Sequence, residues 1–360
     1  MAAPHSTPDT WRAISTADYD AAETAALPQL SIPTMMGFQP AAFQSVNWPT
    51  NVRTDAELVR YVDHNFEAET KLMYEPQAEF APVGFYNGFT ETEAAMATQM
   101  RDKIAKMTAE RFGRAVRPMS NLMVQFGPYR CMEALSAAYG RKLSIIEPGP
   151  GAGYLGALLA QAGYSYASYD VTQALYLWQS HLLDVTAEGA FTELAHKDAD
   201  LTVDRSSVIH MPWWMFAQQF DDTPLRYDLV YSNSNLGEMN SMAFRQLMLF
   251  AKSAMQDSEV AAFTFFSPGM PRFHTIESVD AELQAFGFVP VMTSPFYCYQ
   301  LAGRDPSKIT EAFKDGIPHI GGTRAEATLD VNSVFATSQE EAPLDVRLTR
   351  WFHGWDAPVS

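Results

Sequence analysis

The segment of the chain whose residues are best suited to chemistry is a glycine-rich turn, Glu147-Pro-Gly-Pro-Gly-Ala-Gly153, which follows a short apolar run. Glycine lets the backbone approach a ligand closely because no Cβ stands in the way. A second apolar run ends at Asp170, and a carboxylate in that position can hold both hydroxyls of a ribose. The succession of strand, tight turn, helix, strand and acid predicts a site for a nucleoside cofactor.

Two cofactors compete for this site. Residues 151–156 match the pattern G-x-G-x-x-G, and Asp170 follows at the spacing of a dinucleotide-binding unit. However, Glu147 at the strand end would repel a pyrophosphate and attract the ammonium group of a methionine moiety, and Pro148 and Pro150 offer no N–H to phosphate oxygens. The charge favours S-adenosylmethionine. A nicotinamide or flavin dinucleotide, and an α/β scaffold without a ligand, remain the alternatives.

The elements around this turn alternate between strands and helices. Short apolar runs are typical of buried parallel strands, and stretches with apolar residues three or four positions apart predict helices. This alternation predicts a Rossmann-like, doubly wound, mostly parallel α/β sheet. The predicted strands lie at 143–147, 164–169, 208–210, 227–231, 259–266 and, in two runs broken by Ser294-Pro295, 288–301, with helices over 242–255 and 276–286.

The region before the turn is predicted to be mostly helical. Residues 1–50 are rich in Pro, Ala, Ser and Thr and predict an irregular arm, and helices are expected over 55–74 and 91–111, the second capped by Thr90. A third helix begins near residue 120, with a break expected at Gly127-Pro128 and an end at Gly140. We divide the chain into a helical lid and substrate region (1–117), a Rossmann-like domain (118–304) and a C-terminal extension (305–360) that includes Gly321-Gly322.

Composition excludes several classes of partner. The 360-residue chain carries 42 acidic and 25 basic side chains, a net charge of −17, and it has no run of Lys or Arg, which argues against a nucleic-acid or membrane-surface partner. Its two cysteines, Cys131 and Cys298, lack zinc-ligand spacing. The N-terminus has no signal-peptide pattern and no stretch is long and apolar enough to span a bilayer, so we expect a soluble, cytoplasmic protein.

The turn, the acid at Asp170 and the later strand Tyr227-Asp-Leu-Val-Tyr-Ser232 resemble the successive motifs of class I S-adenosylmethionine-dependent methyltransferases. The resemblance covers about residues 118–301 and implies a seven-stranded sheet. It also implies that the turn contacts the methionine part of the cofactor, that the acid contacts the ribose, and that the residue after the third strand lies near the adenine. The cofactor-binding residues expected from it are Glu147, Gly149, Gly151, Gly153, Asp170, Thr172, Gln173 and Met211.

A narrower likeness concerns three segments, residues 153–159, 170–179 and 235–239, which are similar to a group of bacterial proteins regarded as sugar O-methyltransferases. The chain lacks Asn-Pro-Pro-Tyr after the fourth strand, where it has Ser232-Asn-Ser-Asn235, which lowers the expectation of an amino-group methyltransferase acting on nucleobases or glutamine. It also lacks an acidic cluster there that would hold magnesium. We therefore expect no metal.

Transfer of a methyl group to a hydroxyl needs a general base close to the acceptor, beyond the carboxyl ends of the strands. Three residues are candidates for this base: Glu238, His210 and His274. Each also has an ordinary explanation, namely charge compensation at a helix start for Glu238, a core or adenine-lining histidine for His210, and a loop position for His274. His181 is expected to be structural.

Substrate contacts are expected from Asn233 and Asn235, which could also be simple turn formers, and from Trp213 in the aromatic cluster 211–216, which could equally fill the core. The sequence therefore predicts a methyltransferase that acts on a small-molecule acceptor, with the hydroxyl of a sugar or metabolite favoured. An N- or C-methyltransferase of a small metabolite or peptide, and a non-catalytic cofactor-binding subunit, remain alternatives. The resemblance leaves a homodimer open.

Overall fold

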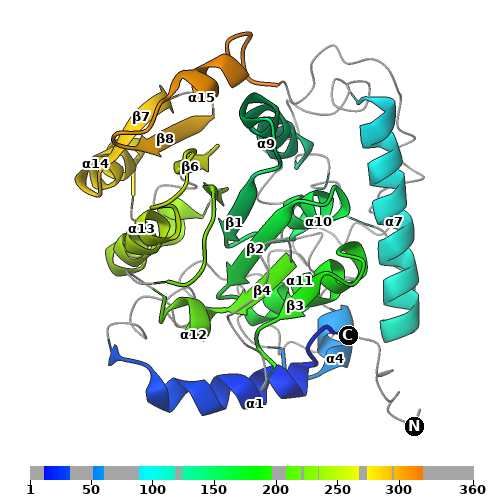
Figure 1. Cartoon of the computed structure of the whole chain (residues 1–360). Helices are drawn as coiled ribbons and strands as arrows, with labels where there is room; N and C mark the ends of the chain where they lie inside the picture. The colour runs from blue at the N-terminus through cyan, green and yellow to red at the C-terminus, as the bar shows by residue number, and fades with distance from the viewer. Residues whose placement is uncertain are drawn as a thin grey trace, which may run out of the picture.

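The computed structural model of the chain (Figure 1) describes most of the region that carries these motifs. The described residues are 12–32, 52–60, 89–116, 118, 122, 125–196, 208–219, 223–233, 235–266, 274–293 and 296–318. Several predictions fall outside them: the arm at 1–11 and 33–51, the helix beyond residue 60, the break at Ser294-Pro295 and the glycine pair Gly321-Gly322. No helix in the described ranges is both long and apolar enough to cross a membrane.

A single mixed sheet forms the centre of the fold, with strand order β3-β4-β2-β1-β5-β6-β8-β7. Only β8 runs antiparallel to its neighbours β6 and β7; the other pairs are parallel. The strands are β1 Ser144–Pro148, β2 Ser165–Asp170, β3 Phe191–Glu193, β4 Val208–Pro212, β5 Leu229–Ser232, β6 Ala262–Phe265, β7 Phe288–Thr293 and β8 Tyr297–Leu301.

The prediction of a doubly wound, mostly parallel α/β sheet is therefore confirmed, but the predicted strand count of seven is wrong. The additional strand is β3, a three-residue segment that pairs in parallel with β4 at the sheet edge. Its sequence, Phe191-Thr-Glu193, is too short for any periodic pattern to mark it as a strand.

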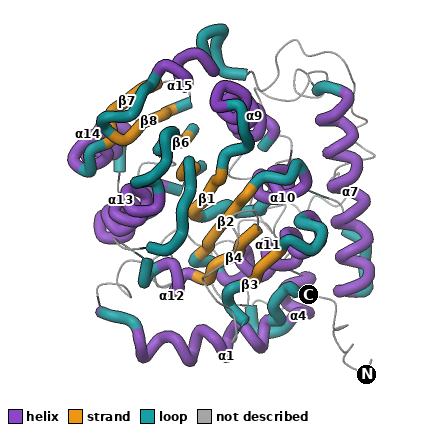
Figure 2. The backbone as a smooth tube through the Cα atoms, viewed as in Figure 1, coloured by secondary structure: helices purple, strands orange, loops and turns teal. Residues whose placement is uncertain are grey.

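Helices alternate with the strands and cover both faces of the sheet (Figures 1 and 2). The chain leads outward from β1 through β2 to β4, and in the other direction from β5 to β6. Because such crossovers are right-handed, α10 and α11 lie on one face of the sheet and α13 lies on the other. The helices of this domain are α9 Phe126–Tyr139, α10 Tyr154–Gln161, α11 Gln173–Thr186, α12 Trp213–Phe216, η4 Leu236–Glu238, α13 Ser241–Ala254, α14 Ile276–Ala285 and α15 Ser307–Ala312.

Local capping signals were predicted well. Thr90 and Glu93 form a capping box at the start of α7 (Glu91–Phe112), and Gly140 ends α9 in the left-handed conformation. The helix expected from near residue 120 is interrupted slightly before the predicted break at Gly127-Pro128, since Gln125 forms a turn and α9 starts at Phe126. Gly127 and Pro128 lie in the first turn of α9, where backbone N–H groups have no partner within the helix, so that proline costs no hydrogen bond.

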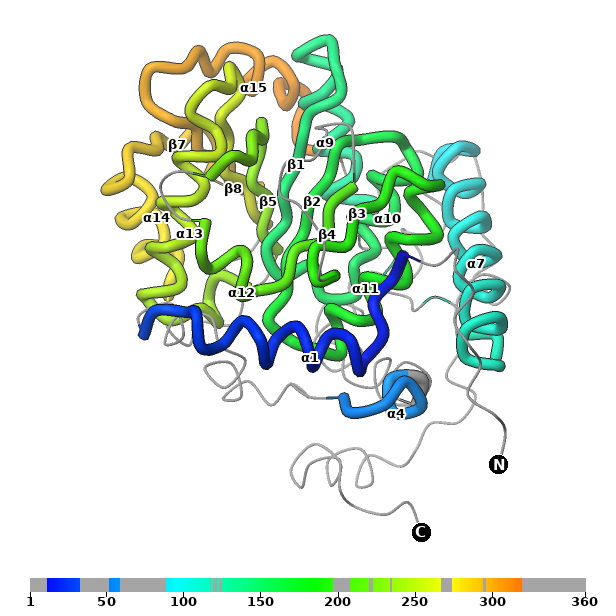
Figure 3. The backbone as a smooth tube through the Cα atoms, turned by 60° about the horizontal axis from the view of Figure 1, so that its bottom comes forward, coloured from blue at the N-terminus to red at the C-terminus, as the bar shows by residue number. Residues whose placement is uncertain are grey.

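Three further elements precede the domain: α1 Thr16–Ala26, the short η1 Leu27–Gln29 and α4 Asp55–Arg60. The long helix α7 packs against α11 as an outer layer. Figures 1 and 3 show α1 running across the edge of the sheet at which β2 and β4 end. The N-terminal segment therefore lies over the edge where the sequence predicts the cofactor.

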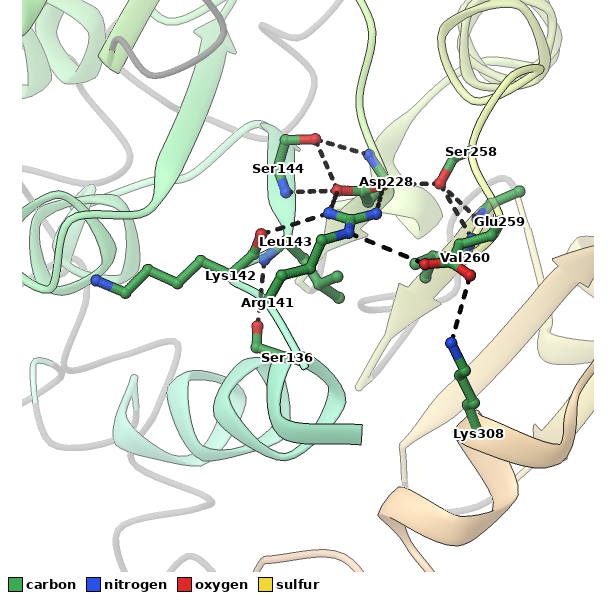
Figure 4. Close-up of polar contacts among 11 residues, drawn as sticks. Ser136, Arg141, Lys142, Leu143, Ser144, Asp228, Ser258, Glu259, Val260 and Lys308 are labelled. Carbon is green, nitrogen blue, oxygen red and sulfur yellow. Dashed lines mark hydrogen bonds and ion pairs between the residues drawn. The ribbon is translucent and has the colours of Figure 1, made fainter. Parts of the chain in front are cut away.

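At the opposite end of the strands, where they begin, a buried aspartate bonds to several segments of the chain (Figure 4). Asp228, just before β5, accepts hydrogen bonds from Arg141 Nη1 at 2.6 Å and Nη2 at 2.8 Å, from the backbone N of Ser144 at 2.9 Å and from Ser258 Oγ at 2.7 Å. These contacts join the starts of β1, β5 and β6. They lie at the far end of the strands from the glycine turn and serve the fold.

Candidate functional site

The order of the strands locates a crevice for a ligand. It lies at the point where the chain connections change direction along the sheet. Strands β1 and β5 are neighbours, and the chain leaves β1 toward β2 but leaves β5 toward β6. Connections that diverge in this way open a crevice beyond the carboxyl ends of the two strands, and ligands of open α/β sheets bind there. The glycine turn follows β1 and Asn233–Glu238 follow β5, so both flank this crevice.

The glycine turn adopts the backbone that its sequence demands. Gly149, Gly151 and Gly153 all have positive φ, at 60°, 58° and 71°. The N–H of Gly149 donates to the backbone O of Tyr169 at 2.9 Å, which ties the turn to β2. A Cβ at Gly151 would meet nothing within 4 Å, so this part of the turn faces open space that a ligand can approach.

Asp170 ends β2 beside the turn, as predicted, and its carboxylate is 4% exposed. Oδ1 accepts from the backbone N of Thr172 at 2.8 Å, and Oδ2 accepts from Gln179 Nε2 at 2.9 Å. Burial raises the pKa of Asp170 to about 6, although these hydrogen bonds and one from the backbone of Gly151 act to lower it. The group is thus largely ionised at pH 7 and already fixed in place.

Glu147 lies at the end of β1, is 2% exposed, and accepts a hydrogen bond from Tyr166 Oη at 2.7 Å. Burial raises its pKa to about 8; the bond from Tyr166 lowers it and the charge of Asp170 raises it further. The sequence predicts a carboxylate at this position, whereas a pKa of about 8 leaves Glu147 mostly protonated at neutral pH. A cation beside it would restore the negative charge.

The hydrogen-bonding capacity of the site suits a cationic ligand that is rich in donors. Among the described residues, the side chains with a hydrogen bond to Glu147, Asp170 or the turn are those of Tyr166, Trp178, Gln179 and Asn235, with no Lys or Arg. Gln179 Oε1 is a buried acceptor without a partner. An ammonium group and ribose hydroxyls would find acceptors here, whereas a diphosphate would find few donors and no cation. The residues therefore fit S-adenosylmethionine better than a dinucleotide.

Thr172 and Gln173, predicted to contact the cofactor, are buried at the start of α11. Thr172 contributes its backbone N–H to Asp170. The side chain of Gln173 instead bonds to the N-terminal region, since Nε2 donates to Asp20 and Oε1 accepts from the backbone N of Val52 at 2.7 Å. A cofactor role for Gln173 stays a prediction. Its amide would have to bond the cofactor in addition to Asp20 and Val52, or lose those two bonds.

Met211 and Trp213 lie where β4 ends and α12 begins, and both are fully buried. Trp213 Nε1 donates to Glu23 Oε1 of α1 at 2.7 Å. Tyr19, also on α1, contacts the rings of Tyr176 and Trp214 with centroid separations of 5.0 Å in each case. Helix α1 therefore covers the aromatic cluster. A ligand could contact Trp213 only in the space between this cluster and α1.

The three predicted bases have different surroundings. His210 lies inside β4, which extends beyond the predicted end at residue 210 to Pro212. Its Nδ1 is 3.0 Å from Ser168 Oγ and its Nε2 is 3.1 Å from the backbone O of Tyr176. Burial lowers its pKa to about 3. With both ring nitrogens engaged in the core, His210 is poorly suited to proton transfer with a substrate.

His274 is better suited. It is 5% exposed and precedes α14, and its Nε2 has no hydrogen-bond partner among the described residues. The backbone of Met239 hydrogen-bonds the ring, which also packs against Phe244 at 4.8 Å between centroids. Burial lowers the pKa of His274, so the imidazole is neutral at pH 7 and can accept a proton. Glu238, half-buried in η4, immediately precedes Met239, and the fold thus brings these two candidates to the same side of the crevice.

The two predicted substrate-binding asparagines are placed differently. Asn235 is half-buried, and its Nδ2 donates to the backbone O of Pro148 while Oδ1 accepts from Ser232 Oγ. Its amide therefore supports the glycine turn in this structure. Asn233 is half-buried directly after β5. Substrate contacts for both residues stay predictions.

No protein-family model matches the chain, and neither does any curated protein. Among solved structures, it is similar to magnesium protoporphyrin IX methyltransferase from Synechocystis PCC 6803 with bound SAM: 16% identity, 57% of this chain, 94% of that one, TM-score 0.31. It is also similar to the CcbJ methyltransferase from Streptomyces caelestis, with 13% identity, 57% of this chain and 99% of that one covered, and a TM-score of 0.33. A third similar structure is an O-methyltransferase family protein from Burkholderia thailandensis, with 12% identity, 80% of this chain and 96% of that one covered, and a TM-score of 0.35. At these scores the alignments assign no function by themselves.

Within the described residues, no group of three or more His, Cys, Asp or Glu side chains is arranged to hold a metal ion. His181, expected to be structural, lies 2.7 Å by its Nδ1 from Arg111 Nη1, and burial lowers its pKa to about 3. This contact joins α11 to α7.

Sequence reasoning missed two residues that the fold brings to the site, Gln179 and Tyr19. Gln179 lies among the apolar side chains of α11 and is fully buried. A glutamine in such a helix must find partners, and this was the available signal. Tyr19 gave no signal, because its approach to the site depends on how α1 docks.

Proposed function

We propose that this chain is an S-adenosylmethionine-dependent methyltransferase that transfers a methyl group to a hydroxyl of a small molecule, with a sugar or related metabolite as the favoured acceptor. The observation that carries the proposal is the pair of buried acids, Glu147 and Asp170, beside an open glycine turn at the switch point of the sheet. The site offers hydrogen-bond acceptors, and no Lys or Arg among the described residues bonds to them. It therefore favours a cationic nucleoside over a phosphorylated one.

In this proposal Glu147 holds the ammonium group of the cofactor, Asp170 holds the ribose hydroxyls, and the turn from Gly149 to Gly153 lies along the methionine part. Met211 lies near the adenine. S-adenosylmethionine, when bound, supplies a methyl group on a sulfonium that is already activated for displacement. The protein then has to align the acceptor and keep water away.

His274 is the proposed base. The Nε2 of its neutral imidazole has no partner in the part of the chain that the structure describes, and the backbone of Met239 fixes the orientation of the ring. A base oriented in this way can accept the proton of an acceptor hydroxyl as the new bond forms. Glu238, one residue from Met239, would orient the acceptor or serve as the base in place of His274.

The N-terminal region, residues 1–117, is proposed as a lid over the substrate side, residues 118–304 as the catalytic domain and 305–360 as an extension of it. The position of α1 supports the lid role, because Asp20, Tyr19 and Glu23 contact Gln173, Tyr176 and Trp213 respectively. Access to the crevice would then require displacement of α1.

The test is binding followed by turnover. Calorimetry should detect S-adenosylhomocysteine and S-adenosylmethionine but not NAD(P)H, and incubation of S-adenosylmethionine with a small-molecule extract should release S-adenosylhomocysteine. Mass analysis of the methylated product distinguishes an O-, N- or C-methyl group. Binding without turnover under all conditions would support the non-catalytic alternative, and tight binding of a dinucleotide alone would refute the proposal.

A further inference from the structure

We propose that Gln179 and Asn235 are positioning residues that hold the glycine turn from its two sides. The pair is here termed the carboxamide clamp. Gln179 reaches the turn from α11 and Asn235 reaches it from the loop after β5. The consequence for cofactor affinity rests on the function proposed above, whereas the effect on the turn itself does not.

Gln179 connects the turn to the acid at the end of β2. Its Nε2 donates to the backbone O of Gly151 at 2.6 Å and to Asp170 Oδ2 at 2.9 Å. The backbone of Gly151 also hydrogen-bonds Asp170. The three groups therefore form a closed set in which both the turn and the carboxylate are fixed by one amide.

The chemistry of the partners determines the orientation of this amide. A carbonyl oxygen and a carboxylate oxygen are both acceptors, so only the NH2 end of Gln179 can face them, and its two hydrogens serve both. The buried Oε1 has no hydrogen-bond partner among the residues that the structure describes. Its burial therefore has an uncompensated cost, which indicates that the side chain is placed for its two donated bonds.

Asn235 holds the other end of the turn. Its Nδ2 donates to the backbone O of Pro148 and lies 3.4 Å from that of Gly149, and its Oδ1 accepts from Ser232 Oγ. The hydroxyl of Ser232 fixes the orientation of this amide in the same way as the acceptors fix that of Gln179. The end of β5 is thereby joined to the end of β1 across the switch point.

The side chains of Asn235 and Gln179 occupy the space in which side chains on the turn would otherwise lie. A Cβ on Gly149 would be 2.4 Å from Asn235 Nδ2, and a Cβ on Gly153 would be 2.9 Å from Gln179 Cγ. Gly151, between them, faces open space. The clamp therefore contacts the turn at its two ends and leaves the middle of the turn accessible to a ligand.

Two single variants test the clamp, each in the full-length protein. Gln179→Met keeps the length of the side chain and removes both donors, and Asn235→Asp keeps the acceptor for Ser232 and removes the donor to Pro148. Gln284→Met is the matched control, because Gln284 is exposed on α14 and its side chain donates to Asp280 of the same helix. Amide hydrogen exchange of residues 149–153 is measured without ligand.

We expect faster exchange at residues 149–153 in both clamp variants, with exchange in β2 and β5 unchanged, and wild-type behaviour in the control. Affinity for S-adenosylhomocysteine should fall by about tenfold or more in each clamp variant. Combined with Asp170→Ala, Gln179→Met should cause less than its full single-variant loss, because part of its effect passes through that carboxylate and the rest through the carbonyl of Gly151. A merely structural glutamine would give additive losses.

Unchanged exchange at the turn in both variants would overturn the clamp, as would a rise spread evenly over the sheet. If wild-type protein binds neither S-adenosylmethionine nor S-adenosylhomocysteine, the proposed function fails, and the exchange measurement still decides whether the clamp exists.

Discussion

Tyr166 Oη lies 2.7 Å from Glu147 Oε2 and donates to it across the adjacent strands β1 and β2. The ring of Tyr166 also packs against α10 at Gly156, where a Cβ would be 2.4 Å from the ring. Glu147 is therefore held at the strand end by a neutral donor and has no described cationic partner. A buried acid in this state responds strongly to a cation placed beside it.

The first prediction concerns protons released on binding. The pKa of Glu147 is about 8, and a bound ammonium group should lower it well below 7. At pH 7 the acid then changes from protonated to ionised, so binding of S-adenosylhomocysteine should release about one proton. Calorimetry in two buffers that differ in ionisation enthalpy measures this number. Release of no proton would mean that Glu147 does not contact the ammonium group.

The second prediction concerns the cost of the same acid to the fold. Glu147 titrates near pH 4.5 in the unfolded chain and near 8 in the folded one, so its ionisation removes stability as the pH rises through this window. Glu147→Gln should therefore raise the unfolding temperature at pH 8 more than at pH 5. Its affinity for S-adenosylhomocysteine should fall about tenfold or more. A variant that is less stable at pH 8 than the wild type would contradict this account.

The third prediction concerns the ribose. Asp170→Ala should weaken binding of S-adenosylmethionine by ~1–3 kcal/mol, the usual loss when hydrogen bonds to a charged acceptor are removed. Calorimetry measures the affinity, and circular dichroism checks the fold. Asp257→Ala serves as a control, since Asp257 is an exposed aspartate that pairs with Arg226. Equal affinity in wild type and Asp170→Ala would remove the ribose role.

The fourth prediction identifies the base. His274→Gln should reduce kcat strongly and leave cofactor affinity intact, whereas Glu238→Gln should cause a smaller loss if that residue only orients the acceptor. Because burial lowers the pKa of His274 below its ordinary value of 6.5, wild-type turnover should decline only in acid below that value. His196→Gln, an exposed histidine, is the control. If turnover survives in His274→Gln and is lost in Glu238→Gln, the two roles are reversed.

The fifth prediction concerns stability at the opposite edge of the sheet. Burial favours protonation of Asp228, but hydrogen bonds from Arg141, Ser144 and Ser258 outweigh it and hold its pKa below the ordinary value. Its contribution is therefore present at neutral pH and is lost as the pH falls through that lowered pKa. Asp228→Asn should destabilise the protein by ~1–3 kcal/mol in urea unfolding at pH 7, the usual cost of weakening hydrogen bonds to a charged acceptor when its ion-pair partner, Arg141, is partly exposed. Cofactor affinity should not change, and a loss of affinity in folded protein would show that the two edges are coupled.

The sequence was sufficient for the features that depend on neighbouring residues. The glycine turn, the acid at the end of the second strand, the capping box at Thr90 and the helix end at Gly140 each follow from side chains a few positions apart. The alternation of strands and helices likewise predicted the doubly wound sheet. These signals are local because backbone geometry and capping are local.

The roles of individual side chains depended on contacts between distant segments, and only the tertiary structure decided them. Both ring nitrogens of His210 bond to the core within β4, and the amide of Asn235 bonds to the turn. Gln179 and Tyr19 approach the site through the docking of α11 and α1, which no spacing in the sequence reveals. Burial also changed the charge state expected of Glu147. Desolvation and hydrogen-bond partners are set by which segments pack together, and a linear sequence specifies that packing only through the complete fold.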